Sequence, residues 1–326
     1  MSLAFAATEI ERARDVFFDK VAAAQIFLGH DVANDVIERL QDDVDHQRGD
    51  PPPGYSAVEW SDALSNAFRL DEELVAQVVS ATPRSVAEIR GLHETFVRSM
   101  QDGTNQPVAV YVPSTYDPAK PAPLVVALHG RPQTETALLG GVVIRGMAEA
   151  SGAIAIAPWG RGNYDFAEPA GSEVYEAVDA VTHALAIDPQ RIYLTGYSMG
   201  GFSVYNVAPL RCNRWAGIMS IAGAIVNSKT AAYLERCANV KLYIVNGAND
   251  DSIPPKYGEQ SAAFLTGKGL RVSFYQEPHG THYLRSLEPA LKRAWGDMLA
   301  GSVHPVLSRS APLEEPPTMM KPTHPY

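Results

Sequence analysis

Cysteine is scarce in this sequence: the 326 residues contain two, Cys212 and Cys237. No nearby cysteine or histidine completes the four ligands of a structural zinc site, so we expect no metal. A free cysteine behaves as a small, often buried apolar side chain, and we interpret these two as free, partly buried thiols. A single disulfide is the alternative, and it would imply an oxidising compartment.

Long apolar runs and a targeting signal are also missing. No stretch approaches the roughly 18 uninterrupted apolar residues of a membrane helix, so a membrane span is not expected. Residues 1–10 lack the basic region and the long apolar segment of a secretory signal. We therefore expect a cytoplasmic location, unless a signal was once present and has been removed.

Basic residues are in the minority, which bears on the partners. The net charge is −10, and residues 1–80 hold 16 acidic and 6 basic residues against 21 of each in the remainder. A nucleic-acid partner would need a basic face, so we expect none. Because the whole excess of acid lies in the first quarter of the chain, we predict that residues 1–85 form a separate acidic extension.

The predicted extension is helical. Apolar residues recur at helical spacing over residues 8–47 and 57–80, and the proline and glycine residues at 50–54 separate the two stretches. Three roles stay open for it: a lid over the active site, a packed extension that borders the site, or the contact of a homo-oligomer. At the other end of the chain, residues 302–326 are rich in proline without periodicity and predict an irregular tail.

Short apolar runs alternate with helical stretches between residues 86 and 301. Unbroken apolar runs are typical of strands buried on both faces, so we expect a mostly parallel sheet covered by helices on both sides. Ligands of such sheets bind beyond the carboxyl ends of the strands. Two runs joined by Asp102-Gly103 predict a hairpin. The runs are 92–99, 108–113, 124–128, 153–157, 191–195, 217–221, 241–245 and 271–275, and the clearest helical stretches are 135–151, 173–186 and 257–267.

The most informative motif follows the run at 191–195. Gly196-Tyr197-Ser198-Met199-Gly200 matches G-x-S-x-G between a strand and a helix. In this motif the serine occupies a tight turn that lifts its hydroxyl above the sheet edge, and the glycines two residues away leave room for the turn. A glycine-rich turn in an inert protein is the alternative. The preceding buried strand favours Ser198 as a nucleophile.

A serine nucleophile needs a base and a group that orients the base. In sheets of this kind the chain order is serine, acid, histidine. Asp250 and Asp251 follow the run at 241–245. We predict Asp250 as the acid, because it falls three residues after Gly247 in the tight turn. Asp251 remains the alternate, and it also suits a helix N-cap.

Two histidines, His279 and His282, follow the run at 271–275. We predict His282 as the base, because Gly280 allows a sharp loop before it and a helix is expected from Leu284. His279 remains the alternate.

Two backbone N–H groups are expected to hold the oxyanion of the reaction. Met199 supplies one at the start of a helix, and Arg131 supplies the other after the run at 124–128. An exposed arginine side chain in such a loop is usually solvated, although it could bind an anion. The aromatic residues of the loop at 158–166 either wall a substrate pocket or cap the core. The predicted substrate-binding residues are Gly130, Tyr197, Trp159 and Tyr164.

Three segments together carry a resemblance to a known family. Residues 188–201 resemble the nucleophile region of the esterase and prolyl-oligopeptidase-like branch of the α/β-hydrolases, and they are similar to polyhydroxybutyrate-depolymerase-type and phospholipase/carboxylesterase-type enzymes. Residues 128–130 and 246–254 resemble the oxyanion and acid motifs of that branch, although Asn246 stands where histidine is usual. The resemblance covers residues 90–300. It implies an α/β-hydrolase fold with about eight strands, and ester or amide hydrolysis without a metal or cofactor.

The sequence therefore predicts a serine esterase whose substrate is a small-molecule ester. A peptidase or acyl-peptide hydrolase with the same three residues is the first alternative. A non-catalytic binding module on a hydrolase fold is the second, and the presence of all three residues disfavours it. The missing HGGG motif disfavours the hormone-sensitive-lipase-like branch, and a serine in place of cysteine disfavours a dienelactone hydrolase.

Overall fold

The structure of the chain is a computed structural model, and it describes residues 36, 38–40, 56–225 and 233–301. Residues 36 and 38–40 are helical, as expected for the first helical stretch. The rest of that stretch, the break at 50–54 and the tail at 302–326 lie outside the described residues. No helix in the described part of the chain has the length and apolar character that a membrane span requires.

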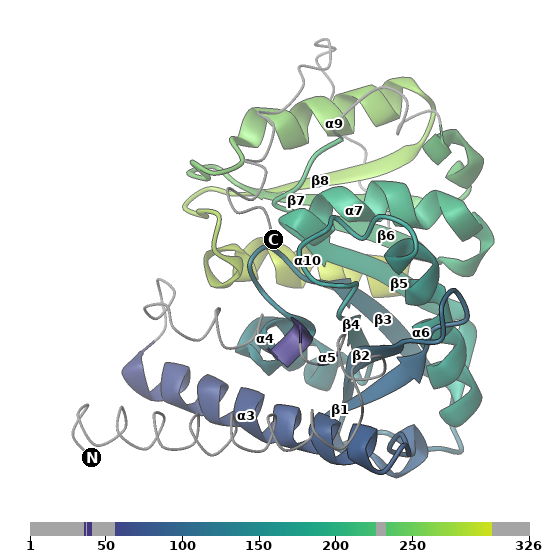
Figure 1. The fold of residues 1–326 in the computed structure, drawn as a ribbon. Coiled ribbons are helices and arrows are strands. Elements are labelled where there is room, and N and C mark those ends of the chain that lie inside the picture. The colour runs from purple at the N-terminus through teal and green to yellow at the C-terminus, as the bar shows by residue number, and fades with distance from the viewer. Residues whose placement is uncertain (1–35, 37, 41–55, 226–232, 302–326) are drawn as a thin grey trace.

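Eight strands form one sheet in the order β1-β2-β4-β3-β5-β6-β7-β8 within the described residues (Figure 1). Strand β2 is antiparallel to both of its neighbours, β1 and β4, and all other neighbouring strands are parallel. The mostly parallel sheet predicted from the apolar runs is confirmed. The strands are β1 (Gly91–Arg98), β2 (Asn105–Val112), β3 (Ala122–Leu128), β4 (Ile154–Pro158), β5 (Ile187–Tyr197), β6 (Gly217–Ile221), β7 (Lys241–Gly247) and β8 (Arg271–Glu277).

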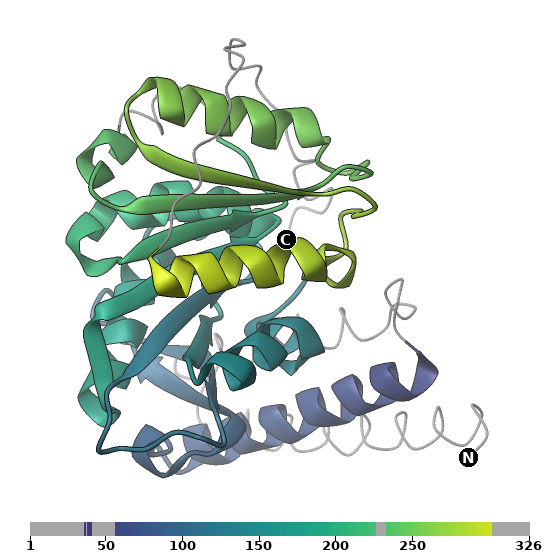
Figure 2. The ribbon, with the colours of Figure 1, turned by 180° about the vertical axis from the view of Figure 1, so that it is seen from behind.

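Helices cover both faces of this sheet. Alternate side chains of β3 enter two apolar layers: Leu124 and Val126 pack with α6, α7 and α9, whereas Val125 and Ala127 pack with α3, α4, α5 and α10. Figure 1 shows α7 and α9 nearer the viewer, and Figure 2, from behind, shows α10 in front. The helices are α3 (Ala57–Val79), α4 (Glu135–Gly140), α5 (Val142–Ser151), α6 (Ala170–Ala184), α7 (Met199–Val207), α9 (Pro255–Gly267) and α10 (Glu288–Ala300).

Two predicted elements differ in detail from the structure. The stretch at 135–151 is two helices, because Gly141 is extended, with φ −64° and ψ 152°, and separates α4 from α5. The helix expected from Leu284 begins as a short 3₁₀ turn, Leu284–Leu287, before α10. The hairpin is as predicted, with Arg98 opposite Asn105 across the turn.

Helix α3 packs directly on the sheet. A capping box of Ser56 and Glu59 begins the helix: the Ser56 hydroxyl accepts from the Glu59 N–H, and the Glu59 carboxylate accepts from the Ser56 N–H. Leu70 is fully buried in the layer that contains β3 and α4. Glu59 also pairs with Arg285 at 2.9 Å, just beyond the loop that carries His282. The N-terminal part of α3 therefore lies close to the candidate site.

A buried ionic cluster joins residue 39 to three elements of the domain. Arg39 is fully buried, and its guanidinium pairs with Asp71 on α3, with Glu94 on β1 at 3.1 Å and with Glu135 on α4 at 2.5 Å. It also donates to the Thr136 hydroxyl at 2.8 Å. Burial raises the pKa of Glu94 well above its usual value. Buried ion pairs are weak evidence for stability, because the cost of desolvating the charges can exceed their attraction. The division of the chain at residue 85 stays a prediction.

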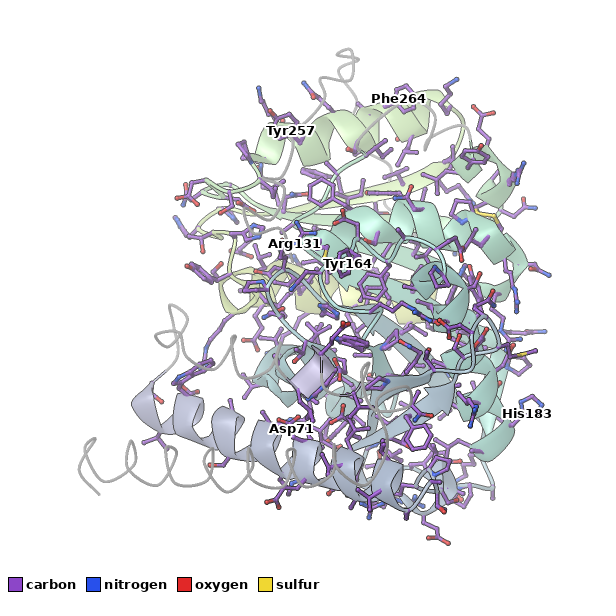
Figure 3. All side chains as sticks on the ribbon, viewed as in Figure 1. Asp71, Arg131, Tyr164, His183, Tyr257 and Phe264 are labelled. Carbon is purple, nitrogen blue, oxygen red and sulfur yellow. A yellow bond between two sulfur atoms is a disulfide. The ribbon has the colours of Figure 1, made fainter. Side chains whose placement is uncertain are left out.

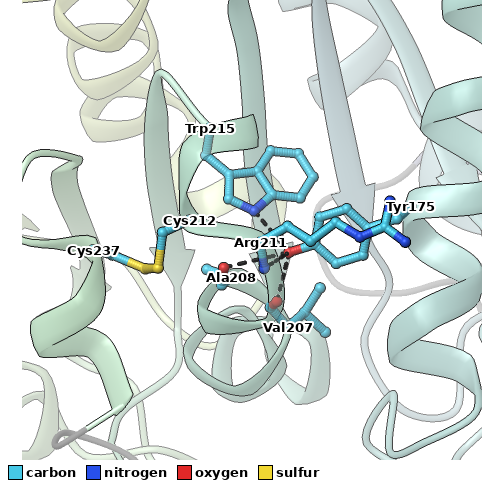
Figure 4. The surroundings of a disulfide bond; sticks show 7 residues. All are labelled: Tyr175, Val207, Ala208, Arg211, Cys212, Trp215 and Cys237. Carbon is cyan, nitrogen blue, oxygen red and sulfur yellow. Dashed lines mark hydrogen bonds between the residues drawn. A yellow bond between two sulfur atoms is a disulfide. The ribbon is translucent and has the colours of Figure 1, made fainter.

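The two cysteines form a disulfide, so the interpretation as free thiols is wrong. Their Cα atoms lie 5.0 Å apart, and the bond joins two short 3₁₀ segments, Ala208–Arg214 and Glu235–Cys237. Beside it, the Tyr175 hydroxyl donates to the Val207 carbonyl and accepts from the Trp215 indole (Figure 4). Sequence spacing did not reveal that the two segments meet. Disulfides persist mainly in oxidising compartments, and the compartment of this protein stays a prediction.

Removal of this disulfide is expected to lower the free energy of unfolding by roughly 3 to 4 kcal/mol, because the bond closes a loop across 25 positions of the unfolded chain. Denaturant unfolding of the double variant Cys212→Ser/Cys237→Ser measures the change. A reducing agent should destabilise the wild type equally and leave the double variant unaffected. A loss below about 1 kcal/mol would contradict the expectation.

Candidate active site

Ser198 occupies the sharp turn between β5 and α7. Its backbone has φ 53° and ψ −114°, a conformation that L-residues rarely adopt, and its N–H donates to the Ile221 carbonyl at 2.9 Å. The flanking glycines are required by contact: a Cβ on Gly196 would lie 2.1 Å from the Gly200 carbonyl oxygen, and one on Gly200 would lie 2.2 Å from that of Leu128. The G-x-S-x-G spacing therefore follows from backbone packing at this turn.

Ser198, His282 and Asp250 form a continuous hydrogen-bonded chain. Ser198 Oγ lies 2.9 Å from His282 Nε2, and His282 Nδ1 lies 2.9 Å from Asp250 Oδ2. The other oxygen, Asp250 Oδ1, accepts from the backbone N–H groups of Ser252 at 3.0 Å and Ile253 at 2.7 Å. Asp250 is buried, and both of its oxygens have partners. This arrangement orients the imidazole with its Nε2 toward the serine hydroxyl.

The two alternates lie outside this chain. Asp251 is exposed, and the contact recorded for its carboxylate is with the Ser252 hydroxyl, at 3.5 Å. His279 is exposed in the loop after β8, three positions before His282. The structure therefore brings Asp250 and His282 to Ser198, and not the neighbouring residue of each type.

The predicted oxyanion residues border Ser198. Met199 is the first residue of α7, so its N–H is among those that have no acceptor within the helix. Gly130 packs against the nucleophile turn: an added Cβ would lie 3.0 Å from the Tyr197 ring and 3.1 Å from Ser198 Cβ. Arg131 follows it directly. The two segments that carry the predicted N–H donors thus meet beside the serine hydroxyl.

The aromatic candidates have different surroundings. The Tyr197 hydroxyl donates to the His282 carbonyl at 2.9 Å, and the two rings are 5.5 Å apart, so Tyr197 supports the histidine loop. Trp159 is buried, and its carbonyl lies 2.7 Å from His129 Nε2. Tyr164 is 48% exposed. Of the three aromatic candidates, Tyr164 is the most accessible to a ligand.

The Arg131 side chain is held by the loop after β4. Its guanidinium donates to the Asn163 carbonyl and lies 3.4 Å from the Asp165 carboxylate. Asn163 directly precedes Tyr164, and Figure 3 labels Arg131 and Tyr164. The arginine therefore joins two loops of the site. Binding of a substrate anion by this side chain stays a prediction.

Sequence reasoning missed three residues near this loop. His129 is fully buried between the Gly130 and Trp159 carbonyls. Arg161 and Glu38 line a pocket of about 360 Å³ beside Trp159 and Tyr164. His129 belongs to the motif at residues 128–130 in the sequence analysis, although no role of its own was predicted for it. Nothing in the sequence placed Glu38 near a loop more than 100 positions away. Among the described residues, no group of three or more histidine, cysteine, aspartate or glutamate side chains is arranged so that it could hold a metal ion.

Comparison with known proteins supports the same fold. No protein-family model matches the chain. A bifunctional acetylxylan esterase/xylanase of Neocallimastix patriciarum is 27% identical over 204 residues, which are 60% of this chain and 29% of that protein. The chain thus matches less than a third of the length of this relative.

Two solved structures illustrate the structural likeness. FphF of Staphylococcus aureus, a fluorophosphonate-binding serine hydrolase, has a TM-score of 0.56 and 16% identity, over 64% of this chain and 98% of that one. A ferulic acid esterase of Anaeromyces mucronatus has a TM-score of 0.53 and 15% identity, over 67% and 91%. Peptidases are matched as well. The strand order and these matches show that the chain has the α/β-hydrolase fold.

Proposed function

We propose that the protein is a serine esterase that cleaves carboxylic esters through an acyl-enzyme, with Ser198 as nucleophile, His282 as base and Asp250 as the orienting acid. The observation that carries the proposal is the unbroken contact from Ser198 Oγ through both nitrogens of His282 to Asp250, with 2.9 Å at each step. A non-catalytic binding module would have no need for this arrangement in a strained turn.

The proposed reaction uses these groups in sequence. Ser198 Oγ attacks the ester carbonyl while His282 Nε2 takes the hydroxyl proton, and the Met199 and Arg131 N–H groups stabilise the oxyanion. As the intermediate collapses, the C–O bond to the alcohol breaks and the imidazolium returns the proton to the departing oxygen. Water then attacks the acyl-enzyme by the same path and releases the acid and free Ser198. The negative charge of Asp250 stabilises the imidazolium at both stages.

An ester is the favoured substrate over an amide. The relative detected by sequence is an acetylxylan esterase/xylanase, and a ferulic acid esterase is among the structural matches. Both names include an esterase. Short-chain acyl or aryl esters are therefore the proposed substrate class, and peptide or acyl-peptide bonds are the second candidate.

Matched chromogenic substrates separate the two candidates. We expect the protein to hydrolyse p-nitrophenyl acetate with saturation kinetics and to turn over the corresponding p-nitroanilides far more slowly, because an anilide is the poorer leaving group. His279→Ala serves as a control and should keep the wild-type kcat. Equal or faster turnover of the anilides would favour the peptidase, and no turnover of either would contradict a hydrolase.

A further inference from the structure

A pocket lies beside the candidate active site and belongs to none of the proposed catalytic groups. It has a volume of about 360 Å³ and lies between residue 38 and the loop that joins β4 to α6. We call it the Trp159 pocket. Its walls include two aromatic side chains, a proline, two carboxylates and a guanidinium, contributed by Trp159, Tyr164, Pro169, Glu38, Glu168 and Arg161.

The loop that carries the pocket is fastened to the segments around the nucleophile. The Trp159 carbonyl lies 2.7 Å from Nε2 of His129, which directly precedes the predicted oxyanion loop. Ser203, on the helix that Ser198 begins, donates its hydroxyl to the Asp165 carbonyl at 2.8 Å. The pocket therefore has a fixed position relative to the candidate nucleophile.

The strand order of the sheet gives an approximate distance between the Trp159 pocket and Ser198. Trp159 directly follows β4, and β3 alone separates β4 from β5, the strand that ends at Ser198. Two strand spacings of about 4.8 Å place the β4 end roughly 10 Å from the β5 end. A short acyl ester bound at Ser198 would not reach the pocket, whereas a group carried on an arm of roughly that length would.

The charges of the pocket favour one sign of ligand. The Arg161 guanidinium already pairs with Glu173 at 2.5 Å and Asp102 at 2.7 Å, so its charge is compensated. Glu38 and Glu168 are exposed, and neither accepts a hydrogen bond or ion pair from any other described residue. Aromatic faces beside carboxylates attract cations and disfavour anions.

We propose that the Trp159 pocket is a substrate subsite that binds the distal part of an extended ester, roughly 10 Å from the scissile carbonyl, and prefers positively charged over neutral and neutral over anionic groups. The proposal rests on the proposed esterase function. It gives Glu38 a role as one wall of the subsite. The adjacent Arg39, through its buried ion pairs with Glu94 and Glu135, holds that wall against the domain.

The test compares esters that differ only at the far end. One series carries an ammonium, a methyl or a carboxylate group about 10 Å from the carbonyl, in the acyl arm or in the alcohol arm, and a second series carries the same groups close to the carbonyl. We expect kcat/KM of the long ammonium ester to exceed that of the long carboxylate ester roughly tenfold in at least one arm. The double variant Glu38→Gln/Glu168→Gln should bring that ratio close to one. It should leave the ratio of the short series unchanged.

Glu259→Gln is the matched control, because Glu259 is also exposed but lies on α9, which packs on β7 and β8 at the other end of the sheet. The subsite would be overturned if neither arm showed a charge preference, or if the double variant kept the preference. Turnover of the short esters would in that case still support the proposed esterase function. Binding of the long ammonium and carboxylate esters to Ser198→Ala, measured by calorimetry, tests the subsite without turnover. Equal affinities there would overturn it as well.

Discussion

Ser198→Ala is expected to lower kcat for p-nitrophenyl acetate by a factor of roughly 10⁴ to 10⁶, because it removes the atom that would form the acyl-enzyme. The fold should survive the change. Among the described side chains, Ser198 Oγ is hydrogen-bonded to His282 alone, and the backbone N–H bond to Ile221 remains. Initial rates at saturating substrate measure the effect, and the thermal midpoint of unfolding reports on the fold.

The matched control for this variant is Ser252→Ala. Ser252 lies in the acid loop, and its backbone N–H, not its hydroxyl, contacts Asp250. Its removal should change kcat by less than about threefold, as is usual for an exposed serine away from the reacting atoms. A Ser198→Ala variant that keeps near-wild-type kcat would remove Ser198 from the mechanism.

Asp250→Asn is expected to lower kcat by roughly 10⁴, because it changes which nitrogen of the His282 ring carries the proton. The backbone N–H groups of Ser252 and Ile253 hold an oxygen at the Oδ1 position. In the variant the amide oxygen takes that place, and the NH₂ group faces His282 Nδ1. The ring then carries its proton on Nε2, and it can no longer accept the proton of Ser198.

Asp251→Asn changes the same chemical group one position away and provides the comparison. Asp251 is exposed and does not contact His282, so kcat should stay within about twofold of the wild type. A large loss in Asp251→Asn with little loss in Asp250→Asn would exchange the two assignments.

Much of the sheet was predictable because its strands are short, apolar and buried on both faces. The run at 124–128 carries no polar residue, and the run at 241–245 carries one charged residue, Lys241, at its start; they are strands β3 and β7 in the structure. The hairpin was predictable from its Asp-Gly turn. The division of residues 135–151 into two helices was less visible, because a glycine within a helical pattern does not by itself say whether the helix stops there.

Some features of the candidate site were also predictable from the sequence, and others were not. Local sterics fix the turn at Ser198, so its glycine spacing is legible in the sequence. The choice between His279 and His282 depends on where a loop turns, and the choice between Asp250 and Asp251 depends on which carboxylate the Ser252 and Ile253 amides hold. The contacts of residues 38 and 39, like the disulfide, join positions distant in sequence. A single sequence does not show which residues distant along the chain contact one another in the fold.

Covalent labelling of the folded protein with a fluorophosphonate, followed by intact mass and peptide mapping, tests most directly whether Ser198 is the nucleophile. We expect one adduct per chain, on the peptide that contains Ser198, and no adduct in Ser198→Ala. An unlabelled wild type, an adduct on another residue, or equal labelling of Ser198→Ala would contradict this expectation.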